Sequence, residues 1–116
     1  MAKLQVYGLK KCSTCQKAIA GMEAAGHQVT FRDVSTDPLD EAERRALLER
    51  FGEKLVNRAS LTWRGMDEVE RAADPVIQIG AKPSLMKRPA IIGDEGHWLG
   101  WTATVRRALG AEDQQR

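Results

Sequence analysis

The elements that the sequence predicts occur in the order of an α/β protein with a mixed four-stranded sheet and a central helical insertion. Two observations predict this class. The first third of the chain reads strand, helix, strand, which is typical of a parallel unit. Further on, two apolar runs flank GDEG, a hairpin signature that adds an antiparallel pair. The 116 residues suit a single domain.

The parallel unit is predicted over residues 3–34. Its first strand, KLQVYGL, alternates apolar residues with others. The turn KKCSTC leads into a helix that we expect Ser13 or Thr14 to cap and Gly26 to end. HQVTFRDV then supplies the second strand.

The helical insertion is predicted over residues 38–80. We expect its first helix to begin near Ser35 or Asp37, with Pro38 in the first turn, and to end at Gly52. The following stretch, EKLVNRASLTWRGMDEVERAAD, is less regularly helical, and DPVIQIGAKPSLMKRP is too broken to assign.

The last predicted part covers residues 88–109. Its hairpin pairs Ala90–Ile92 with Trp98–Trp101 across the GDEG turn. A final amphipathic helix, TATVRRALGAE, is expected to be capped by Thr102 and ended by Gly110. The three parts complete the predicted fold.

The composition is that of a globular protein in water, with 42% hydrophobic and 29% charged residues. The net charge of +2 is too small to indicate direct nucleic-acid binding. No stretch approaches the roughly 18 apolar residues that a membrane span needs. Because the N-terminal stretch does not resemble an export signal, we expect a cytoplasmic protein, whose thiols are kept reduced.

The two cysteines, Cys12 and Cys15, stand at the start of the first predicted helix. Unpaired N–H groups and the positive end of a helix stabilise a thiolate there, and Lys10 and Lys11 add to this if they point toward the sulfur. We expect Cys12, in the turn, to be the nucleophile. Cys15 follows one helical turn later and is the expected resolving thiol.

Two other interpretations of the cysteine pair stay open. Free cysteines are often buried and inert, so both could be structural. A zinc site would need four ligands, usually including a second tight pair, whereas His27 and His97 are far apart in the sequence. We therefore expect no bound metal ion.

Three stretches together resemble the arsenate reductase family of the glutaredoxin-coupled ArsC type, which includes the Spx-like transcriptional regulators and the YffB-like proteins. They are the cysteine loop YGLKKCSTCQKA, the segment LVNRASLTWRGMDE, and KPSLMKRPAIIGDEGHWLGW. The resemblance extends from Val6 to Leu109. It implies a thioredoxin-like (glutaredoxin-like) fold.

The resemblance also implies that Cys12 attacks the substrate, that Arg58 and Arg88 hold an oxyanion, and that the peptide bond before Pro89 is cis. Arginine suits such a ligand because its guanidinium is planar, bidentate and permanently charged. The same charges would lower the pKa of the Cys12 thiol. The residues expected around the substrate are Lys11, Ser13, Thr14, Arg58, Arg88 and Pro89.

The sequence departs from the reductases in two places. The reductases have a third arginine, and at about the matching position this chain has Trp101 instead. They usually lack a cysteine at the position of Cys15, whereas the CxxC pair matches the Spx-like regulators, in which it acts as a disulfide switch. The other arginines are expected to be exposed helix residues: Arg64, Arg71, Arg106 and Arg107.

The predicted function is thiol-dependent reduction, in which Cys12 attacks an oxyanion such as arsenate or a glutathione mixed disulfide and Cys15 or glutathione resolves the adduct. Glutathione with glutaredoxin, or thioredoxin, is the expected electron donor. No cofactor is expected to be bound. The alternative is an Spx-like redox-sensing regulator that binds RNA polymerase.

Overall fold

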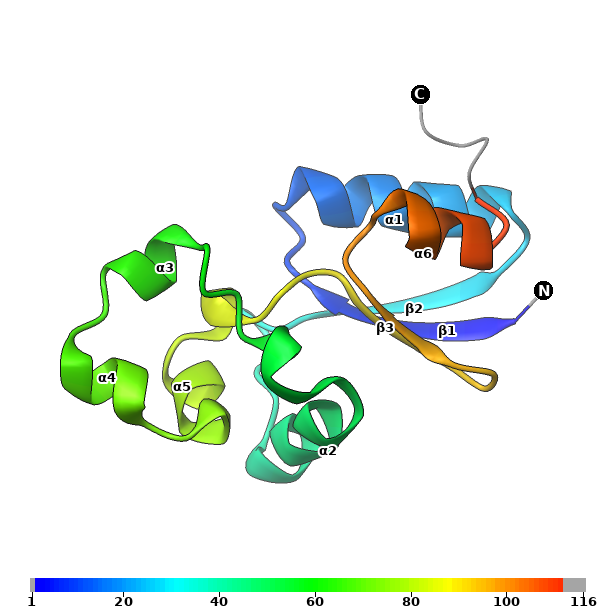
Figure 1. Ribbon diagram of the computed structural model, residues 1–116. Helices are drawn as coiled ribbons and strands as arrows, with labels where there is room; N and C mark the ends of the chain where they lie inside the picture. Colours follow the sequence, from blue (N-terminus) through cyan, green and yellow to red (C-terminus); the bar gives the residue numbers. More distant parts are fainter. Residues whose placement is uncertain (1, 112–116) are drawn as a thin grey trace. The chain divides into compact units, whose positions relative to one another are not determined.

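The computed structural model describes residues 2–111, which form two compact units (Figure 1). The first unit combines the chain up to Asp33 with the chain from Arg88 onward. The second unit is Val34–Lys87, so it begins earlier and ends later than the expected insertion over residues 38–80. In the described part of the chain, no helix has the length and apolar character that crossing a membrane requires.

The first unit contains a four-stranded mixed sheet, as the sequence predicted. The strand order is β2-β1-β3-β4, with β1 parallel to β2 and antiparallel to β3, and with β3 antiparallel to β4. The strands are β1 (Lys3–Gly8), β2 (Gln28–Asp33), β3 (Ala90–Gly93) and β4 (His97–Leu99). The hairpin of β3 and β4 confirms the turn predicted at GDEG, but its second strand is His97–Leu99 rather than the expected Trp98–Trp101.

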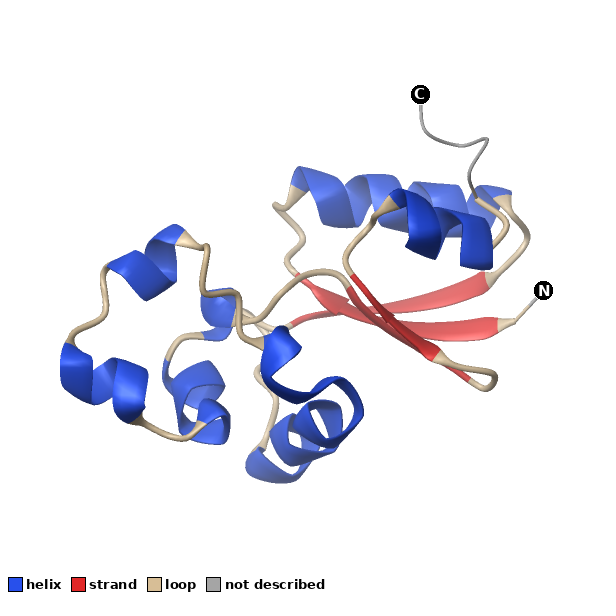
Figure 2. Cartoon of the chain, in the orientation of Figure 1, coloured by secondary structure: helices blue, strands red, loops and turns tan. Residues whose placement is uncertain are grey.

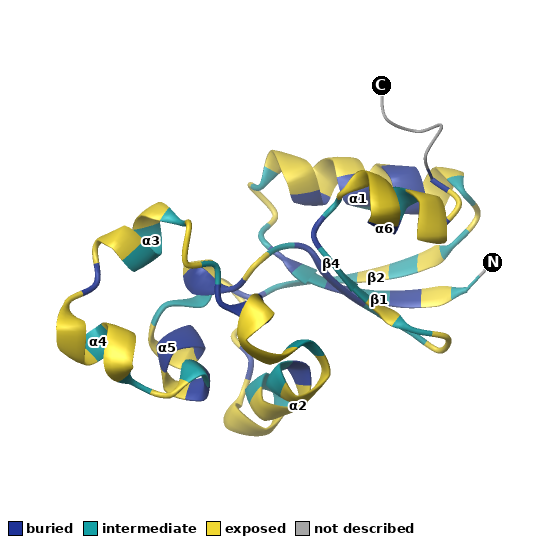
Figure 3. Ribbon diagram, viewed as in Figure 1, coloured by how far each residue is buried: buried dark blue, intermediate teal, exposed yellow. Residues whose placement is uncertain are grey.

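Two helices, α1 (Ser13–Ala24) and α6 (Ala103–Ala108), lie over one face of this sheet (Figure 2). Their apolar sides form a core with the strands, and the remaining positions of both helices are largely exposed (Figure 3). Trp98 and Trp101 pack against this core from the hairpin side. The buried core residues are Leu4, Val6, Ala18, Met22, Ile91, Val105 and Leu109.

The ends of α1 were predicted in part. Gly26 follows the helix with φ 94°, a conformation that glycine adopts without steric cost, as expected. The expected cap at Ser13 or Thr14 is wrong, because the N-cap is Cys12 and no side chain caps the first turn. The first N–H groups of α1 can therefore donate to acceptors within the cysteine loop itself.

The ends of α6 agree with the sequence. Thr102 is the N-cap, and its hydroxyl accepts from the Val105 N–H at 3.3 Å. Gly110 follows the helix with φ 71°. His27, from the turn between α1 and β2, also fixes this end, because its Nε2 lies 2.7 Å from the Leu109 carbonyl.

The second unit is built from short helical segments. The longest, α2 (Glu41–Phe51), begins later than predicted, because Asp40 rather than Ser35 or Asp37 is its N-cap. The Asp40 carboxylate accepts from the Glu43 N–H, and the Glu43 carboxylate accepts from the Asp40 N–H. This reciprocal pair satisfies two N–H groups at once and so defines the start. Gly52 ends the helix with φ 66°, as predicted.

The stretches that the sequence left irregular or unassigned form three further short α-helices and two 3-10 segments among the described residues. Arg44 of α2 donates to the carbonyl of Val76 at 2.9 Å and so joins α2 to the helix that contains Val76. It also donates to the carbonyl of Leu39, just before α2, at 2.8 Å. The segments are η1 (Gly52–Leu55), α3 (Leu61–Arg64), α4 (Glu68–Ala72), α5 (Pro75–Ala81) and η2 (Pro83–Leu85).

Candidate active site

The turn between β1 and α1 presents the two cysteines in different surroundings. Cys12 is half-buried, whereas the Cys15 side chain is fully buried. The turn is closed by a hydrogen bond from the Cys12 N–H to the Leu9 carbonyl at 3.0 Å. Reagents can therefore reach the sulfur of Cys12, and they can reach Cys15 only after a local opening.

The electrostatics of this turn favour a thiolate at Cys12. Partial burial acts to raise its pKa, but hydrogen bonds from the backbone and thiol of Cys15, from the Thr14 N–H and from the Arg88 side chain outweigh that effect. The net result is a pKa of Cys12 below its ordinary value. Lys10 and Lys11, which we expected to help, are exposed.

Cys15 is shifted the other way. Burial raises the pKa of Cys15 to about 11, and the hydrogen bond to Cys12 and the charge on Cys12 add to the rise. A backbone hydrogen bond from Leu9 and the charge of Arg88 oppose it without cancelling it. As the pH rises, Cys12 is thus the first of the two thiols to ionise, while Cys15 stays protonated and donates to it.

Gly8, the last residue of β1, makes room for the buried sulfur. A Cβ atom at this position would lie 2.5 Å from the Sγ of Cys15, closer than real Cβ contacts allow. The residue directly before the turn therefore has to be glycine if Cys15 is to keep its position.

Arg88 and Pro89 enter the same unit just before β3. The Arg88–Pro89 peptide is cis, as the resemblance implied, and Pro89 is fully buried. The Arg88 guanidinium is hydrogen-bonded to Cys12. The Pro89 carbonyl accepts from the Gly100 N–H at 2.8 Å, which extends the pairing of β3 with β4 by one bond.

Two polar residues that the sequence did not single out hold the cysteine turn. The Asp33 carboxylate, at the end of β2, accepts from the Lys10 N–H at 3.0 Å. The Gln16 side-chain amide donates to the Lys10 carbonyl at 2.8 Å. Both contacts fix the residue two positions before Cys12. A local sequence signal exists only for Gln16, which follows the cysteine pair directly.

Comparisons with known proteins give relatives along nearly the whole chain. No family model matches the sequence. An uncharacterized protein from Haemophilus influenzae is 32% identical over 113 residues, covering 93% of this chain and 99% of that protein. An arsenate reductase (ArsC) related protein from Brucella melitensis is also 32% identical, with a TM-score of 0.74 over 91% of this chain and 92% of the other.

The chain belongs to the arsenate reductase (ArsC)-related family. A further ArsC-related structure, a YffB protein, is 25% identical and superimposes with a TM-score of 0.82 over 91% of this chain and 97% of its own. The thioredoxin-like fold that the resemblance implied is thereby confirmed.

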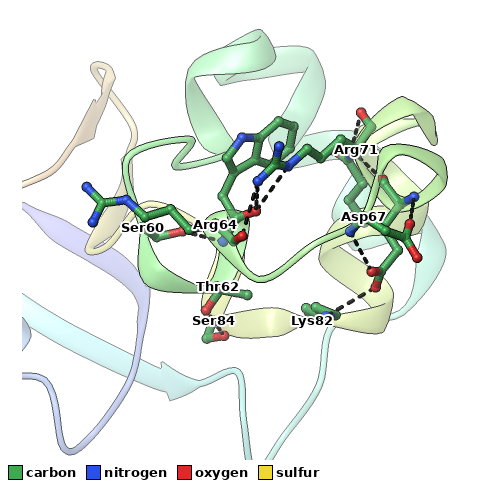
Figure 4. Close-up of polar contacts among 10 residues, drawn as sticks. Ser60, Thr62, Arg64, Asp67, Arg71, Lys82 and Ser84 are labelled. Atoms are coloured by element: carbon green, nitrogen blue, oxygen red, sulfur yellow. Dashed lines mark hydrogen bonds and ion pairs between the residues drawn. The ribbon is translucent and has the colours of Figure 1, made fainter.

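Arg58, the second arginine expected for this ArsC-related protein, lies in the other unit, after η1. Its side chain is 59% exposed, stands 3.8 Å from the Glu53 carboxylate and lies over the Trp63 ring at 5.4 Å. Arg71 contacts the same ring at 5.7 Å and donates to the Trp63 and Arg64 carbonyls (Figure 4). The oxyanion-binding role of Arg58 stays a prediction.

The remaining expected substrate residues of the ArsC-related site stand around Cys12. Lys11, Ser13 and Thr14 are exposed, so a bound ligand can reach them. Their role in substrate binding stays a prediction. Of the arginines expected to be exposed, Arg64, Arg71 and Arg107 are so, but Arg106 is half-buried and bonded to a backbone carbonyl.

Proposed function

We propose that this chain is a thiol-dependent reductase of the arsenate reductase type, in which Cys12 is the nucleophile and Cys15 the resolving thiol. The observation that carries the proposal is the contrast between the two sulfurs. Cys12 is accessible with a lowered pKa, whereas Cys15 is buried with a pKa of about 11. A nucleophile needs access and thiolate character, and a resolving thiol needs proximity and must not react first.

With arsenate as substrate, the Cys12 thiolate forms a sulfur–arsenic bond and an arsenate oxygen leaves as water after protonation. A second thiol, from Cys15 or glutathione, then attacks the Cys12 sulfur. The sulfur–arsenic bond breaks with its electron pair on arsenic, which is reduced from the pentavalent to the trivalent state. The two sulfurs are oxidised to a disulfide.

With a glutathione mixed disulfide as substrate, Cys12 attacks one sulfur and the other leaves as a thiolate. Attack by Cys15 on the new mixed disulfide releases the second thiol and leaves a Cys12–Cys15 disulfide. In either route glutathione with glutaredoxin, or thioredoxin, supplies the two electrons that restore both thiols. These donors belong to a reducing compartment, the cytoplasm.

Arg88 supports both routes. Its permanent charge beside Cys12 stabilises the thiolate and offers bidentate donors to an oxyanion or a carboxylate. We assign Arg58 the same kind of ligand contact, and we expect the exposed Lys11, Ser13 and Thr14 to contact the ligand as well. Pro89 is fully buried and would line the site without donating to the ligand. The thiol group of Cys15 donates to Cys12, so its sulfur is already next to the one that it attacks once it has lost its proton.

The test is turnover by the purified protein with arsenate, and separately with a glutathione mixed disulfide, each coupled to glutaredoxin or to thioredoxin. Cys12→Ser should abolish turnover with every substrate. Cys15→Ser should reduce it or make it depend on added glutathione. Full turnover by Cys12→Ser contradicts the mechanism. No turnover by the wild type, with a reversible Cys12–Cys15 disulfide, favours the redox-sensing alternative instead.

A further inference from the structure

Arg106 occupies an unusual position for an arginine in a terminal helix. Its Nη1 donates to the Trp101 carbonyl at 2.7 Å, and its Nε is buried with no hydrogen-bond partner in the described part of the chain. Burying part of a guanidinium costs free energy unless its donors are satisfied. A purely solvated surface arginine would not lie there.

The direction of this side chain also argues against a helix-end role. Cations near the last turn of a helix are stabilised when they approach its C-terminal carbonyls. Arg106 is in the last turn of α6, yet its guanidinium reaches back to Trp101, which precedes the N-cap Thr102. It is thus held at the positive end of α6, where a cation is disfavoured.

The backbone that Arg106 contacts leads directly to the candidate active site. Trp101 follows Gly100, whose φ of 83° marks a sharp change of direction and whose N–H donates to the Pro89 carbonyl at 2.8 Å. Pro89 follows Arg88, which is hydrogen-bonded to Cys12. Each step of this path lies within the first unit.

Gly100 is the weak point of the path. It has no side chain with which to fix its own conformation, and glycine has the greatest backbone freedom of any residue. The Trp101 side chain packs on the core, but that contact leaves the carbonyl direction open. The 2.7 Å bond from Arg106 fixes the Trp101 carbonyl, which belongs to the residue directly after the Gly100 N–H donor to Pro89.

We propose that Arg106 is a positioning residue of this site, which fixes the Gly100–Trp101 backbone and thereby holds Arg88 and Pro89 beside Cys12. The inference rests on the proposed function, because it assigns Arg106 a part in making Cys12 reactive. Arg106 itself does not touch the reacting sulfur.

The test measures the second-order rate of Cys12 alkylation by iodoacetamide as a function of pH, with peptide mass spectrometry to assign the modified cysteine. Arg106→Met removes the bond, and we expect alkylation at neutral pH to slow about threefold and the pH profile to move to higher pH. Arg107→Met is the matched control, because it removes an equal charge from the neighbouring exposed position. Its rate should equal that of the wild type.

Two further variants keep the test decisive. Arg106→Gln keeps a polar group, but its side chain is too short to reach the Trp101 carbonyl. It should therefore slow alkylation about as much as Arg106→Met, and it serves as the test if the Met variant does not fold. Arg106→Lys keeps a charged donor and should recover part of the rate. Circular dichroism melting curves establish that each variant is folded at the assay temperature.

The outcomes separate this inference from the proposed function. Wild-type rates for folded Arg106→Gln and Arg106→Met, or an equal loss in Arg107→Met, overturn the positioning role and leave the function intact. A wild-type Cys12 that alkylates no faster than glutathione overturns both. Slow alkylation in the Arg106→Met and Arg106→Gln variants, with a wild-type rate in Arg107→Met, supports the inference.

Discussion

The polar contacts around Cys12 in the first unit and those at the helix starts of the second unit span different distances along the chain. In the first unit, the polar contacts around Cys12 join segments far apart in the sequence, such as the bond between Lys10 and Asp33, which are 23 residues apart. In the second unit, the side-chain caps of Asp40, Ser60 and Asp67 reach only three residues along the chain. The reactivity of the first unit therefore depends on tertiary structure, whereas the starts of α2, α3 and α4 depend on local sequence.

The largest expected effect on stability comes from a substitution at Gly8 in the first unit. Gly8→Ala places a Cβ atom against the Cys15 sulfur and should lower the free energy of unfolding by about 1–3 kcal/mol, the usual cost of overpacking. The displaced Cys15 should also form a disulfide with Cys12 more slowly. Gly65→Ala is the matched control, since a Cβ there meets only atoms at 3.7 Å. A Gly8→Ala protein as stable as the control would contradict the close approach.

The pH dependence of stability sharpens the same comparison. Because the pKa of Cys15 is raised to about 11 in the folded state from 9.0, the folded protein keeps a proton that the unfolded chain loses. The stabilisation from this group is thus complete below pH 9.0 and declines as the pH rises toward about 11. Chemical denaturation should show a steeper loss over this window in the wild type than in Cys15→Ala. Parallel pH profiles would contradict the shift.

Asp33 and Asp40 form a direct test of long-range against local contacts. Each carboxylate accepts from a backbone N–H group, and loss of that bond on replacement by alanine should lower the free energy of unfolding by about 1 kcal/mol. Only Asp33→Ala should change the alkylation rate of Cys12, because it releases the Lys10 backbone. An equal effect of Asp40→Ala on that rate would end the distinction between the units.

The smallest expected effect is at the exposed ion pair of α2. Arg45 and Glu41 are separated by 3.0 Å, with side chains 63% and 66% exposed. Glu41→Gln should change the free energy of unfolding by no more than about 0.5 kcal/mol and leave Cys12 unaffected. The urea midpoint of the variant, measured at low and at high salt, checks this. A loss well above that limit would show that the second unit also depends on its surface charges.

The sequence predicted elements whose signals are local. The alternation around Leu4, the hairpin turn between β3 and β4 and the cap at Thr102 each depend on residues a few positions apart. The start of α2 was missed although Asp40 and Glu43 have the spacing of a reciprocal cap, because Pro38 suggested an earlier first turn. That error came from two competing local signals rather than from missing information.

The site could be predicted only as far as its residue types. The spacing of Cys12 and Cys15 indicated the thiol chemistry, and the segment before Pro89 indicated Arg88. No local pattern could show that Asp33 meets Lys10, because that contact joins the end of one strand to a turn 23 residues away. Arg106 and Trp101 are only five residues apart, but the amphipathic pattern of the helix does not show that the side chain turns back to the Trp101 carbonyl. Arg106 therefore looked like any other surface arginine of an amphipathic helix.

The most direct test of the account compares the two cysteines within one reduced sample. The native protein is treated with iodoacetamide across a pH series, and modification of Cys12 and Cys15 is measured separately by peptide mass spectrometry. We predict that Cys12 reacts with a midpoint below pH 9.0, the ordinary value for the thiol, while Cys15 stays protected until the protein is denatured. Equal rates for the two cysteines, or faster modification of Cys15, would contradict the assignment of nucleophile and resolving thiol.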